Sequence, residues 1–428
     1  MLATDNLMEF CSTLSEPAYV FDIDELTEEA ISLKKKLPEG VGVVYAMKAN
    51  PFLVPYLTQY TDSFEVCSYG EFLICERAGV PMEKVVLSGV YKADDDTERI
   101  VKDYGKCLKY TAESPAQLSL LRKLANKYAT RLDVLLRLTA GNQFGMDEST
   151  VTELVRENCD GDAGKNTGLN IIGIQYYSGT QKKKGSIFKE ELEKCDSLLN
   201  SITPFLTGLS QETKPYLEYG PGLCVDYFEN DKSEEEGVRA LTEALCDYTA
   251  KYHINLELGR YMSAHCGAYI TKIVDIKENL GQKYCIVDGG INHLNYYGQT
   301  MAMKIPRILQ LKAADVEAAS KAGQSEKCQD ASKENAKSGS DKDFKEKCMI
   351  CGSLCTVSDV LVRGLTLNAP KVKDVLVFFD VGAYSVTEGI YLFLSHNLPR
   401  IYEYRGGKYT LIREALPTHT LNFIYDLT

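Results

Sequence analysis

The chain has 428 residues, 44% of them hydrophobic and 25% charged, and a formal net charge of −12. This length is enough for two domains, because single cores stop growing near ~250–300 residues. The sequence shows no basic stripe, no run near the ~20 apolar residues that span a bilayer and no secretory signal pattern. We therefore expect a cytoplasmic protein without nucleic-acid or membrane partners, whose 14 cysteines are reduced thiols.

Short apolar runs alternate with helical patterns over residues 27–268. The segment before them, residues 1–26, contains a predicted strand at 18–23, and we expect this segment to join a C-terminal β-domain. Eight strands alternating with helices over ~250 residues predict a (β/α)₈ barrel, although a doubly wound open sheet has the same periodicity. The predicted strands are Val41–Met47, Ser63–Cys67, Lys84–Ser88, Leu108–Thr111, Leu132–Leu138, Ile171–Tyr177, Tyr216–Tyr219 and Asn255–Leu258, and the helices between them include Glu71–Ala78, Pro115–Tyr128, Phe188–Leu199 and Gly237–Tyr252.

Residues 269–428 are rich in strand patterns with few helical ones, which predicts a second, mostly antiparallel β-domain. Within it, residues 313–346 hold almost no large apolar side chains. Such a composition cannot bury enough surface to order itself, so we expect a disordered or loosely helical surface insertion. The predicted strands of this domain are Tyr269–Ile276, Gln282–Val287, Ala302–Leu309, Asp374–Phe379 and Lys408–Ile412.

The ends of the predicted barrel strands carry the candidate chemistry, because a barrel places its active site there. Lys48 ends the first strand, where burial lowers the pKa of an amine and lets it attack a carbonyl, although a solvated lysine at a strand end is the simpler reading. Gly220-Pro-Gly222 follows the seventh strand, and Arg260 follows the eighth, three residues after Glu257. Paired glycines and a guanidinium suit a phosphate. These residues predict a site for a cofactor with a phosphate and an amine-reactive group.

The chain resembles the fold-type III pyridoxal-phosphate decarboxylases, the family of diaminopimelate, ornithine and arginine decarboxylases, in a two-domain arrangement like that of alanine racemase. The similarity runs from Pro17 to Arg400, interrupted by residues 313–346. Its most specific pieces are Tyr45-Ala-Met-Lys-Ala-Asn, Glu257-Leu-Gly-Arg, Cys351-Gly-Ser-Leu-Cys-Thr-Val-Ser-Asp359 and Gly382-Ala-Tyr384.

This resemblance implies pyridoxal 5′-phosphate (PLP) as the cofactor. It implies that Lys48 forms a Schiff base with PLP and that Glu257 keeps the pyridine nitrogen protonated, so that the ring accepts the electrons left by CO₂. It further implies a homodimer with shared active sites, in which Cys355 donates a proton in the partner subunit's site. The phosphate ligands would be Thr180, Gly220, Gly222, Gly259, Arg260 and Tyr384, the ion-pair network around PLP would be Glu65, Glu71 and Arg137, and the substrate contacts would be Tyr296, Thr356 and Tyr384.

The sequence departs from the family pattern at three places. Tyr177 stands where the family stacks a histidine on the cofactor, and a phenol can also stack on a pyridine. Thr356 replaces the acid that holds a distal ammonium, and the segment Ile291–Tyr296 lacks the arginine that holds a distal carboxylate. An unpaired buried charge is costly, so these changes favour a larger or carrier-tethered amino-acid substrate.

Two other functions and one other site stay open at this point. An amino-acid racemase shares the barrel and the lysine, but it places a cation where this chain has Glu257. A non-catalytic homologue that binds a partner protein is disfavoured because Lys48 and Cys355 are kept. The spacing of Cys348, Cys351 and Cys355 invites a metal, but a fourth ligand is missing, and we expect none.

Overall fold

The computed structural model describes residues 4–160, 168–207, 213–325 and 344–424. It divides into two compact units, each described here by itself. The barrel unit comprises residues 27–226 and 232–262, and the sheet unit comprises residues 1–26, 227–231 and 263–428. Helix α2 (Ile23–Lys36) carries the chain from one unit into the other.

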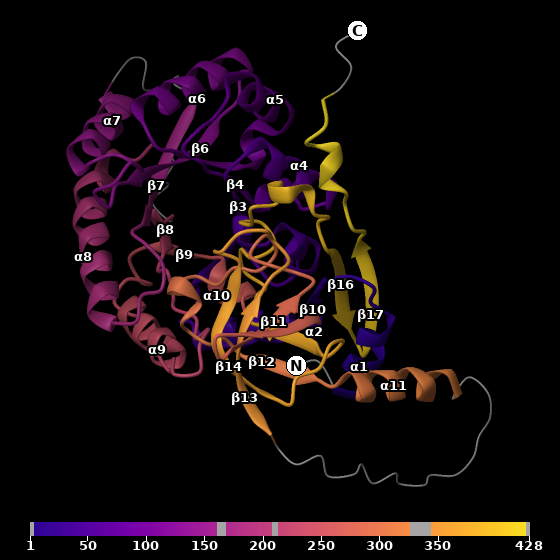
Figure 1. Cartoon of the computed structure of the whole chain (residues 1–428). Helices are drawn as coiled ribbons and strands as arrows, with labels where there is room; N and C mark the ends of the chain where they lie inside the picture. The colour runs from indigo at the N-terminus through magenta and orange to yellow at the C-terminus, as the bar shows by residue number, and fades with distance from the viewer. Residues whose placement is uncertain (1–3, 161–167, 208–212, 326–343, 425–428) are drawn as a thin grey trace. The chain divides into compact units, whose positions relative to one another are not determined.

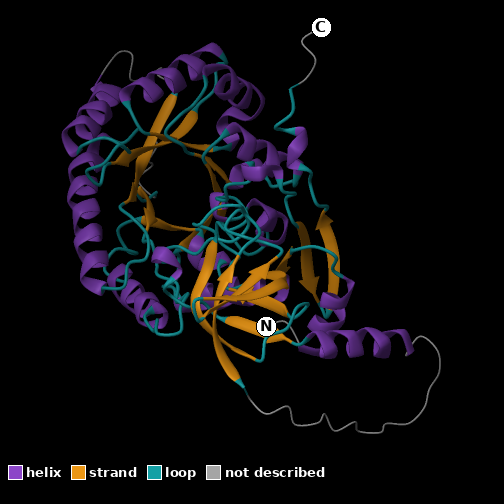
Figure 2. Cartoon of the chain, viewed as in Figure 1, coloured by secondary structure: helices purple, strands orange, loops and turns teal. Residues whose placement is uncertain are grey.

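Eight parallel strands close into a barrel in the described part of the barrel unit, which confirms the predicted (β/α)₈ architecture. Helices surround this ring of strands (Figures 1 and 2). The strands are β2 (Gly42–Ala46), β3 (Ser63–Val66), β4 (Val85–Leu87), β5 (Lys109–Ala112), β6 (Leu132–Leu138), β7 (Leu169–Tyr177), β8 (Tyr216–Gly220) and β9 (His253–Leu258). The helices are α3 (Val54–Leu57), α4 (Tyr69–Arg77), α5 (Asp94–Tyr104), α6 (Pro115–Lys127), α7 (Glu148–Asp160), α8 (Gly185–Ile202), α9 (Glu234–Leu245) and α10 (Arg260–Ser263).

Helices α4 and α6 begin where a serine side chain satisfies a free amide of the first turn. Ser68 Oγ accepts a hydrogen bond from Glu71 N at the start of α4, and Ser114 Oγ accepts one from Gln117 N at the start of α6. Pro115 occupies the first turn of α6, where its missing N–H costs nothing. These caps stop each strand-to-helix loop within a few residues of the strand end, which keeps the functional loops short.

A nine-stranded sheet forms the described part of the sheet unit, and most of its strand pairs are antiparallel, as predicted. The exceptions are the parallel pairs of β1 with β16 and of β11 with β13. The central path runs β14-β13-β11-β10-β1-β16-β17, and β15 joins β10 to β12. The strands are β1 (Ala18–Asp22), β10 (Gly267–Asn279), β11 (Gln282–Val287), β12 (Ile308–Leu311), β13 (Lys345–Cys351), β14 (Val360–Asn368), β15 (Val375–Phe379), β16 (Arg400–Arg405) and β17 (Lys408–Arg413).

The compact units differ in detail from the predicted limits of 1–26, 27–268 and 269–428. Residues 227–231 lie with the sheet unit, because Tyr227 and Phe228 pack on Tyr296 and Phe228 bridges Pro306. The sheet unit also resumes at residue 263, since the backbone N–H of Gly382 donates to Ala264 O.

Two sequence expectations in the sheet unit need correction. The predicted strand Ala302–Leu309 is wrong over most of its length, because Met301 (φ +50°) and Ala302 (φ +58°) have a left-handed backbone that no strand allows, and pairing begins only at Ile308. The predicted insertion at 313–346 is helical at its start, as one of the two expectations had it, but this helix, α11 (Ala313–Ser325), is not loose: it packs against α1 (Thr4–Thr13) and buries Val316. Residues 326–343 lie outside the described residues.

Candidate active site

Lys48 lies at the carboxyl ends of the barrel strands, in a short 3₁₀ turn directly after β2. Its Nζ donates to Glu65 Oε2 and, over 3.1 Å, to Glu257 Oε1, and it lies 3.9 Å from Cys67 Sγ. The side chain of Lys48 is 38% exposed, whereas those of Glu65 and Glu257 are 2% and 6% exposed. The structure therefore joins the predicted lysine to two predicted acids, with the amine on the open side and the carboxyls below it.

The two acids facing Lys48 carry unequal charge. Burial would raise the pKa of Glu65, but the Lys48 ammonium and hydrogen bonds outweigh it and lower that pKa below its usual value. Burial and the charge on Glu65 raise the pKa of Glu257 to about 7, against the opposing effect of Lys48. The Lys48 ammonium therefore stabilises the charge on Glu65, whereas Glu257 holds its proton to a higher pH than an ordinary carboxyl does.

A second polar layer lies deeper in the barrel, and the sequence interpretation missed it. Gln175 Nε2 lies 3.1 Å from Glu218 Oε1 and 3.1 Å from Glu257 Oε2. Burial and the charges on Glu257 and Glu65 raise the pKa of Glu218 to about 8. Acids are almost never fully buried without a partner, so a glutamate inside the apolar strand Tyr216–Gly220 was the signal that could have revealed this layer.

The three residues predicted to form one ion-pair network around the cofactor each have a different partner. Of its three members, Glu65 pairs with Lys48. Arg137 Nη1 donates to Glu113 Oε1 over 2.8 Å, with its guanidinium 4.9 Å from the Phe144 ring centre. Glu71 Oε2 accepts from the Cys67 backbone N–H at 2.6 Å, at the start of α4. Glu113, which sequence reasoning missed, is therefore the partner that keeps the buried guanidinium compensated.

The loops after β7 and β8 form a tight backbone cradle. Gly222 has φ +60°, and a Cβ at this position would lie 1.9 Å from Gly179 O. Lys182 N donates to Gly222 O over 2.9 Å, which ties the two loops together. Arg260 Nε donates to Thr180 Oγ1 over 3.3 Å. Backbone at this close approach, next to a guanidinium and a hydroxyl, suits an anion such as a phosphate.

Two more glycines are required by close packing at the same strand ends. A Cβ on Gly220 would lie 2.6 Å from Cδ2 of the Tyr177 ring, and a Cβ on Gly259 would lie 3.0 Å from the Ala49 Cβ. Gly220 thus makes room for Tyr177, the residue that the sequence comparison put in place of a histidine. Gly259 lets the Arg260 turn approach the turn that holds Lys48.

The remaining predicted site residues lie in the sheet unit. Cys355 is exposed in the loop between β13 and β14, and Asp359 holds this loop by accepting from Ile291 N over 2.9 Å and Leu354 N over 2.7 Å. Thr356, half-buried beside it, exchanges a 2.9 Å hydrogen bond with Ser358.

Two tyrosines of the same unit have different surroundings. Tyr384 is partly exposed and has a left-handed backbone, with φ +67°. Tyr296 is buried, and its hydroxyl donates to Phe379 O over 2.6 Å. Tyr296 therefore has a packing role within its own unit, and its substrate contact stays a prediction without structural support.

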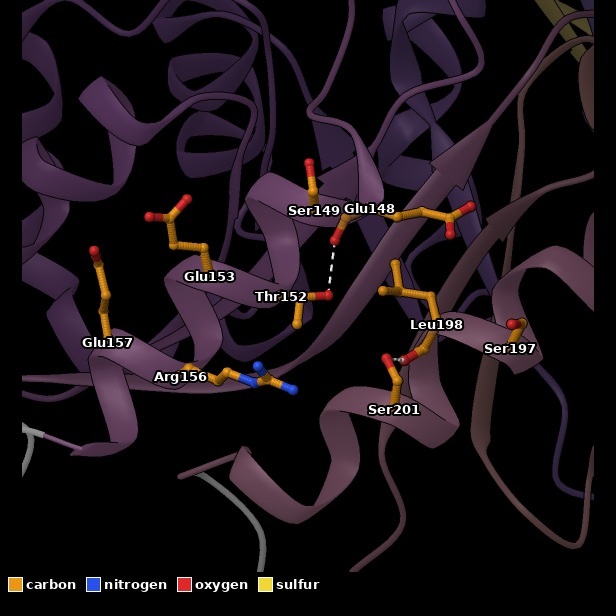
Figure 3. A pocket seen from close by; sticks show the side chains of 9 residues that line it. All are labelled: Glu148, Ser149, Thr152, Glu153, Arg156, Glu157, Ser197, Leu198 and Ser201. Atoms are coloured by element: carbon orange, nitrogen blue, oxygen red, sulfur yellow. Dashed lines mark hydrogen bonds between the residues drawn. The ribbon is translucent and has the colours of Figure 1, made fainter.

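A groove of about 770 Å³ lies between α7 and α8, apart from these residues (Figure 3). Its hydroxyls are used within the helices themselves, because Thr152 Oγ1 donates to Glu148 O and Ser201 Oγ donates to Leu198 O. None of the predicted site residues lines it. Among the described residues, no group of three or more His, Cys, Asp or Glu side chains is arranged to hold a metal, and no helix is long and apolar enough to cross a membrane.

Comparison with known proteins gives one family for the barrel and several full-length relatives. Residues 23–264 match the family model described as "Pyridoxal-dependent decarboxylase, pyridoxal binding domain". Diaminopimelate decarboxylase of Aquifex aeolicus is 29% identical over 308 residues, which are 68% of this chain and 70% of that protein. L-glutamyl-[BtrI acyl-carrier protein] decarboxylase of Niallia circulans is 25% identical over 425 residues, 93% of this chain and 90% of the relative.

A solved structure shows the same fold. The crystal structure of diaminopimelate decarboxylase from M. jannaschii in complex with L-lysine superimposes with a TM-score of 0.76 at 23% sequence identity. The match covers 97% of this chain and 93% of that chain.

Proposed function

The chain belongs to the pyridoxal-dependent decarboxylases, whose model matches more than half of it, and on this premise we propose that it removes CO₂ from an α-amino acid or amino-acid adduct. PLP is the cofactor of this family. The observation that carries the proposal is the contact of Lys48 Nζ with both Glu65 and Glu257 at the open end of the barrel.

The residues at this end fit PLP. An aldehyde needs a reachable amine, and Lys48 is the side chain that projects from the buried acids toward the open side. A phosphate needs close backbone and a cation, and the cradle at Gly222, with Thr180 and Arg260, provides them. A Cβ at Gly222 would fill that cradle. The two requirements are met on strands of one barrel unit.

Each residue has a separate task in this proposal. When bound, PLP supplies an electron sink for the pair of electrons left by CO₂. Lys48 would hold the cofactor covalently through Nζ, and Glu257 would accept a hydrogen bond from the ring nitrogen. The phosphate ligands are Thr180, Gly220, Gly222, Gly259 and Arg260, and Tyr384 is the proposed additional one.

Cys355 is the proposed donor of the proton that replaces CO₂, in a homodimer whose subunits complete each other's sites. Support comes from the exposure of its thiol on a loop held in shape by Asp359. An exposed thiol is available to a second molecule, whereas buried cysteines such as Cys195 are not.

The proposed substrate is larger than lysine or carries a tether. Thr356 offers a hydroxyl and no charge, so a distal ammonium has no partner there. A relative that spans 93% of this chain is named for an aminoacyl carrier protein as substrate. A carboxyl at Glu257, facing Lys48, argues against the racemase alternative, because a cation there would be needed to keep the ring neutral.

The cofactor bond is tested by visible spectroscopy on the full-length protein loaded with PLP. Wild-type protein is expected to show an absorbance band beyond the aromatic region that Lys48→Ala removes. Lys92→Ala is the matched control, because burial lowers the pKa of this second barrel lysine to about 8. Loss of the band in Lys92→Ala, or its persistence in Lys48→Ala, would overturn the assignment.

Activity is tested by measuring CO₂ release from L- and D-amino acids, the diaminopimelate isomers, and glutamate free and attached to a carrier protein. Release from the tethered substrate and not from free lysine is the expected result. A protein that binds PLP through Lys48 and releases no CO₂ from any of them would support the non-catalytic alternative.

A further inference from the structure

Gln175 and Glu218 form a layer directly below Glu257 inside the barrel. They lie opposite each other on β7 and β8, and Glu218 is in register with Asn255 of β9. Glu257 therefore lies two residues nearer the carboxyl ends of the strands. Gln175 is 1% exposed and Glu218 is not exposed at all. No role was assigned to this layer above, and among the described residues its hydrogen bond to the proposed site is the one from Gln175 to Glu257.

The side-chain amide of Gln175 is shared among three oxygens. Its Nε2 lies 3.1 Å from Glu218 Oε1, 3.1 Å from Glu257 Oε2 and 3.3 Å from Ser88 Oγ. An amide has only two N–H donors, and hydrogen bonds to carboxylates are the stronger ones. We therefore assign one N–H group to Glu218 and the other to Glu257. Ser88 Oγ itself donates to Thr111 Oγ1 over 3.1 Å.

We propose that Gln175 is a positioning residue for Glu257: its amide ties one carboxyl oxygen of Glu257 to Glu218 below, and so directs the other oxygen toward the open end of the barrel. The contacts carry this directly, since Oε2 of Glu257 meets Gln175 and Oε1 meets Lys48. The inference rests on the proposed function, in which Glu257 receives the ring nitrogen of PLP.

The charge on Glu218 decides whether this arrangement is stable. The charges that act on Glu218 are those of Glu257 and Glu65, which raise its pKa, and that of Lys109, which has a smaller, opposite effect. Two buried carboxylates bridged by one neutral amide would repel each other strongly. Burial and those two charges raise the pKa of Glu218 to about 8, so Glu218 is uncharged at neutral pH. Glu257 then has a neutral neighbour below it and can take the negative charge that a protonated ring requires.

Two unpartnered atoms are consistent with an uncharged Glu218. Among the described residues, Glu218 Oε2 and Gln175 Oε1 are buried without a hydrogen-bond partner. A buried carboxylate oxygen without a donor is expensive, whereas a protonated acid loses much less by burial. The layer is therefore a neutral support, in which the amide supplies direction and the lower acid adds no charge.

The first test titrates PLP into the stripped full-length protein between pH 5 and pH 9 and follows the visible band. In Gln175→Met, Glu257 loses an N–H donor, so its proton is released at higher pH. We expect the acid-side midpoint of PLP binding to move up by about one pH unit, and binding at pH 7 to weaken about tenfold. Thr111→Val is the matched control, because it removes a buried hydroxyl of the same barrel interior that does not contact Glu257.

A role in packing alone would lower the stability of both variants and leave the midpoint of Gln175→Met at the wild-type value. That result would overturn the inference. Failure of the proposed function looks different, because wild-type protein would then show no band that depends on Lys48.

The second test needs no cofactor and measures unfolding of Glu218→Gln against wild type by urea at several pH values. An acid whose pKa is raised on folding loses stability as pH rises from its unfolded pKa through its folded pKa. The unfolding constant of wild type should therefore rise relative to that of Glu218→Gln as pH increases from about 4.5 to 8. The ratio of the two constants should change by up to about tenfold per pH unit. A difference that does not change with pH would show that Glu218 is ionised in the fold, and the neutral support would be refuted.

Discussion

Lys48 Nζ lies 3.1 Å from Glu257 Oε1, although 209 residues separate them in the chain. The contact exists because β2 and β9 are neighbours in the closed barrel, with Val44 paired to Glu257. Barrel closure thus joins the first and last strands of the barrel unit, and with them the two residues proposed to hold the cofactor.

Glu257→Gln should lower the rate of decarboxylation while leaving the covalent bond between Lys48 and PLP intact. An amide cannot take the negative charge that stabilises a protonated ring, and such hydrogen bonds contribute about 1.5–3 kcal/mol. We expect kcat to fall about 10- to 100-fold. CO₂ release measures the rate and the visible band measures the bond. A variant with full activity would remove Glu257 from the mechanism.

Gly222→Ala should abolish tight PLP binding. The new Cβ would lie 1.9 Å from Gly179 O, so the loops after β7 and β8 must separate. Gly79→Ala is the control, because Gly79 has a similar φ of +70° and nothing within 4 Å of the new Cβ. The left-handed backbone alone costs roughly 1–2 kcal/mol in both variants. The dissociation constant of PLP should rise at least about tenfold in Gly222→Ala alone. Equal affinities would mean that this cradle does not hold the phosphate.

A buried ion pair supports the loop that carries Thr180. Lys182 Nζ bonds both carboxylate oxygens of Glu191 at 2.9 Å, and Tyr219 Oη donates to the same carboxylate over 2.6 Å. Removing one partner of a buried pair costs about 3–5 kcal/mol. Lys182→Met should therefore destabilise the protein by that amount in urea unfolding.

The control for this prediction is the pair of exposed Lys251 with partly exposed Asp196. Lys251→Ala should cost less than about 1 kcal/mol, because water screens surface pairs. Equal losses from Lys182→Met and Lys251→Ala would contradict a structural role for the buried pair.

His293 should make the protein sensitive to acid. It is buried, with Nε2 donating to Asn397 O over 3.0 Å, and burial lowers its pKa from 6.5 to about 4. A base whose pKa is lowered on folding contributes stability above its unfolded pKa, and loses it as pH falls from 6.5 towards 4. Between pH 6.5 and pH 5 this loss amounts to about 2 kcal/mol.

The measurement compares urea unfolding at pH 7 and pH 5 for wild type, His293→Gln and the control His419→Gln, which changes an exposed histidine. The loss on acidification should shrink only in His293→Gln. The same loss in all three proteins would assign the acid sensitivity to other groups.

Cys355→Ala should slow or misdirect protonation without changing the PLP content. Positioned proton donors contribute about 10²–10⁴-fold, so the rate should fall by about a hundredfold or more. Cys107→Ala is the control, as Cys107 is another exposed thiol. Product analysis in deuterated water measures where the proton is added. Loss of PLP from Cys355→Ala would instead assign the thiol a binding role.

Sequence patterns predicted the barrel well because each of its strands is a short apolar run with a local signal. Four strands of the sheet unit, β12, β13, β14 and β16, were misplaced or missed, because their pairing depends on distant partners. β13, for example, pairs with β11 and β14. Left-handed residues such as Met301 leave no mark in hydrophobic periodicity, which is why the strand at Ala302–Leu309 was wrong.

The candidate site divides in the same manner. Lys48, Glu257 and Arg260 were found because each lies at or just after the end of a strand, in a recognisable local motif. Gln175 and Glu218 were not singled out, because they become neighbours of Glu257 only once the barrel closes and their side chains meet inside it. Glu113 was missed as the partner of Arg137, because the two are brought together by the adjacent strands β5 and β6.

From its amino acids alone the chain revealed its family and its cofactor and gave Lys48 as the proposed anchor of that cofactor, since those depend on residue types at short spacing. Only the tertiary structure decided which charged groups lie near each acid and so set its pKa. The pKa values of Glu65, Glu218 and Glu257 follow from their burial and from the charges around them, with Lys48 acting on Glu65 and Glu257. Charge and burial of this kind exist only after the strands have closed.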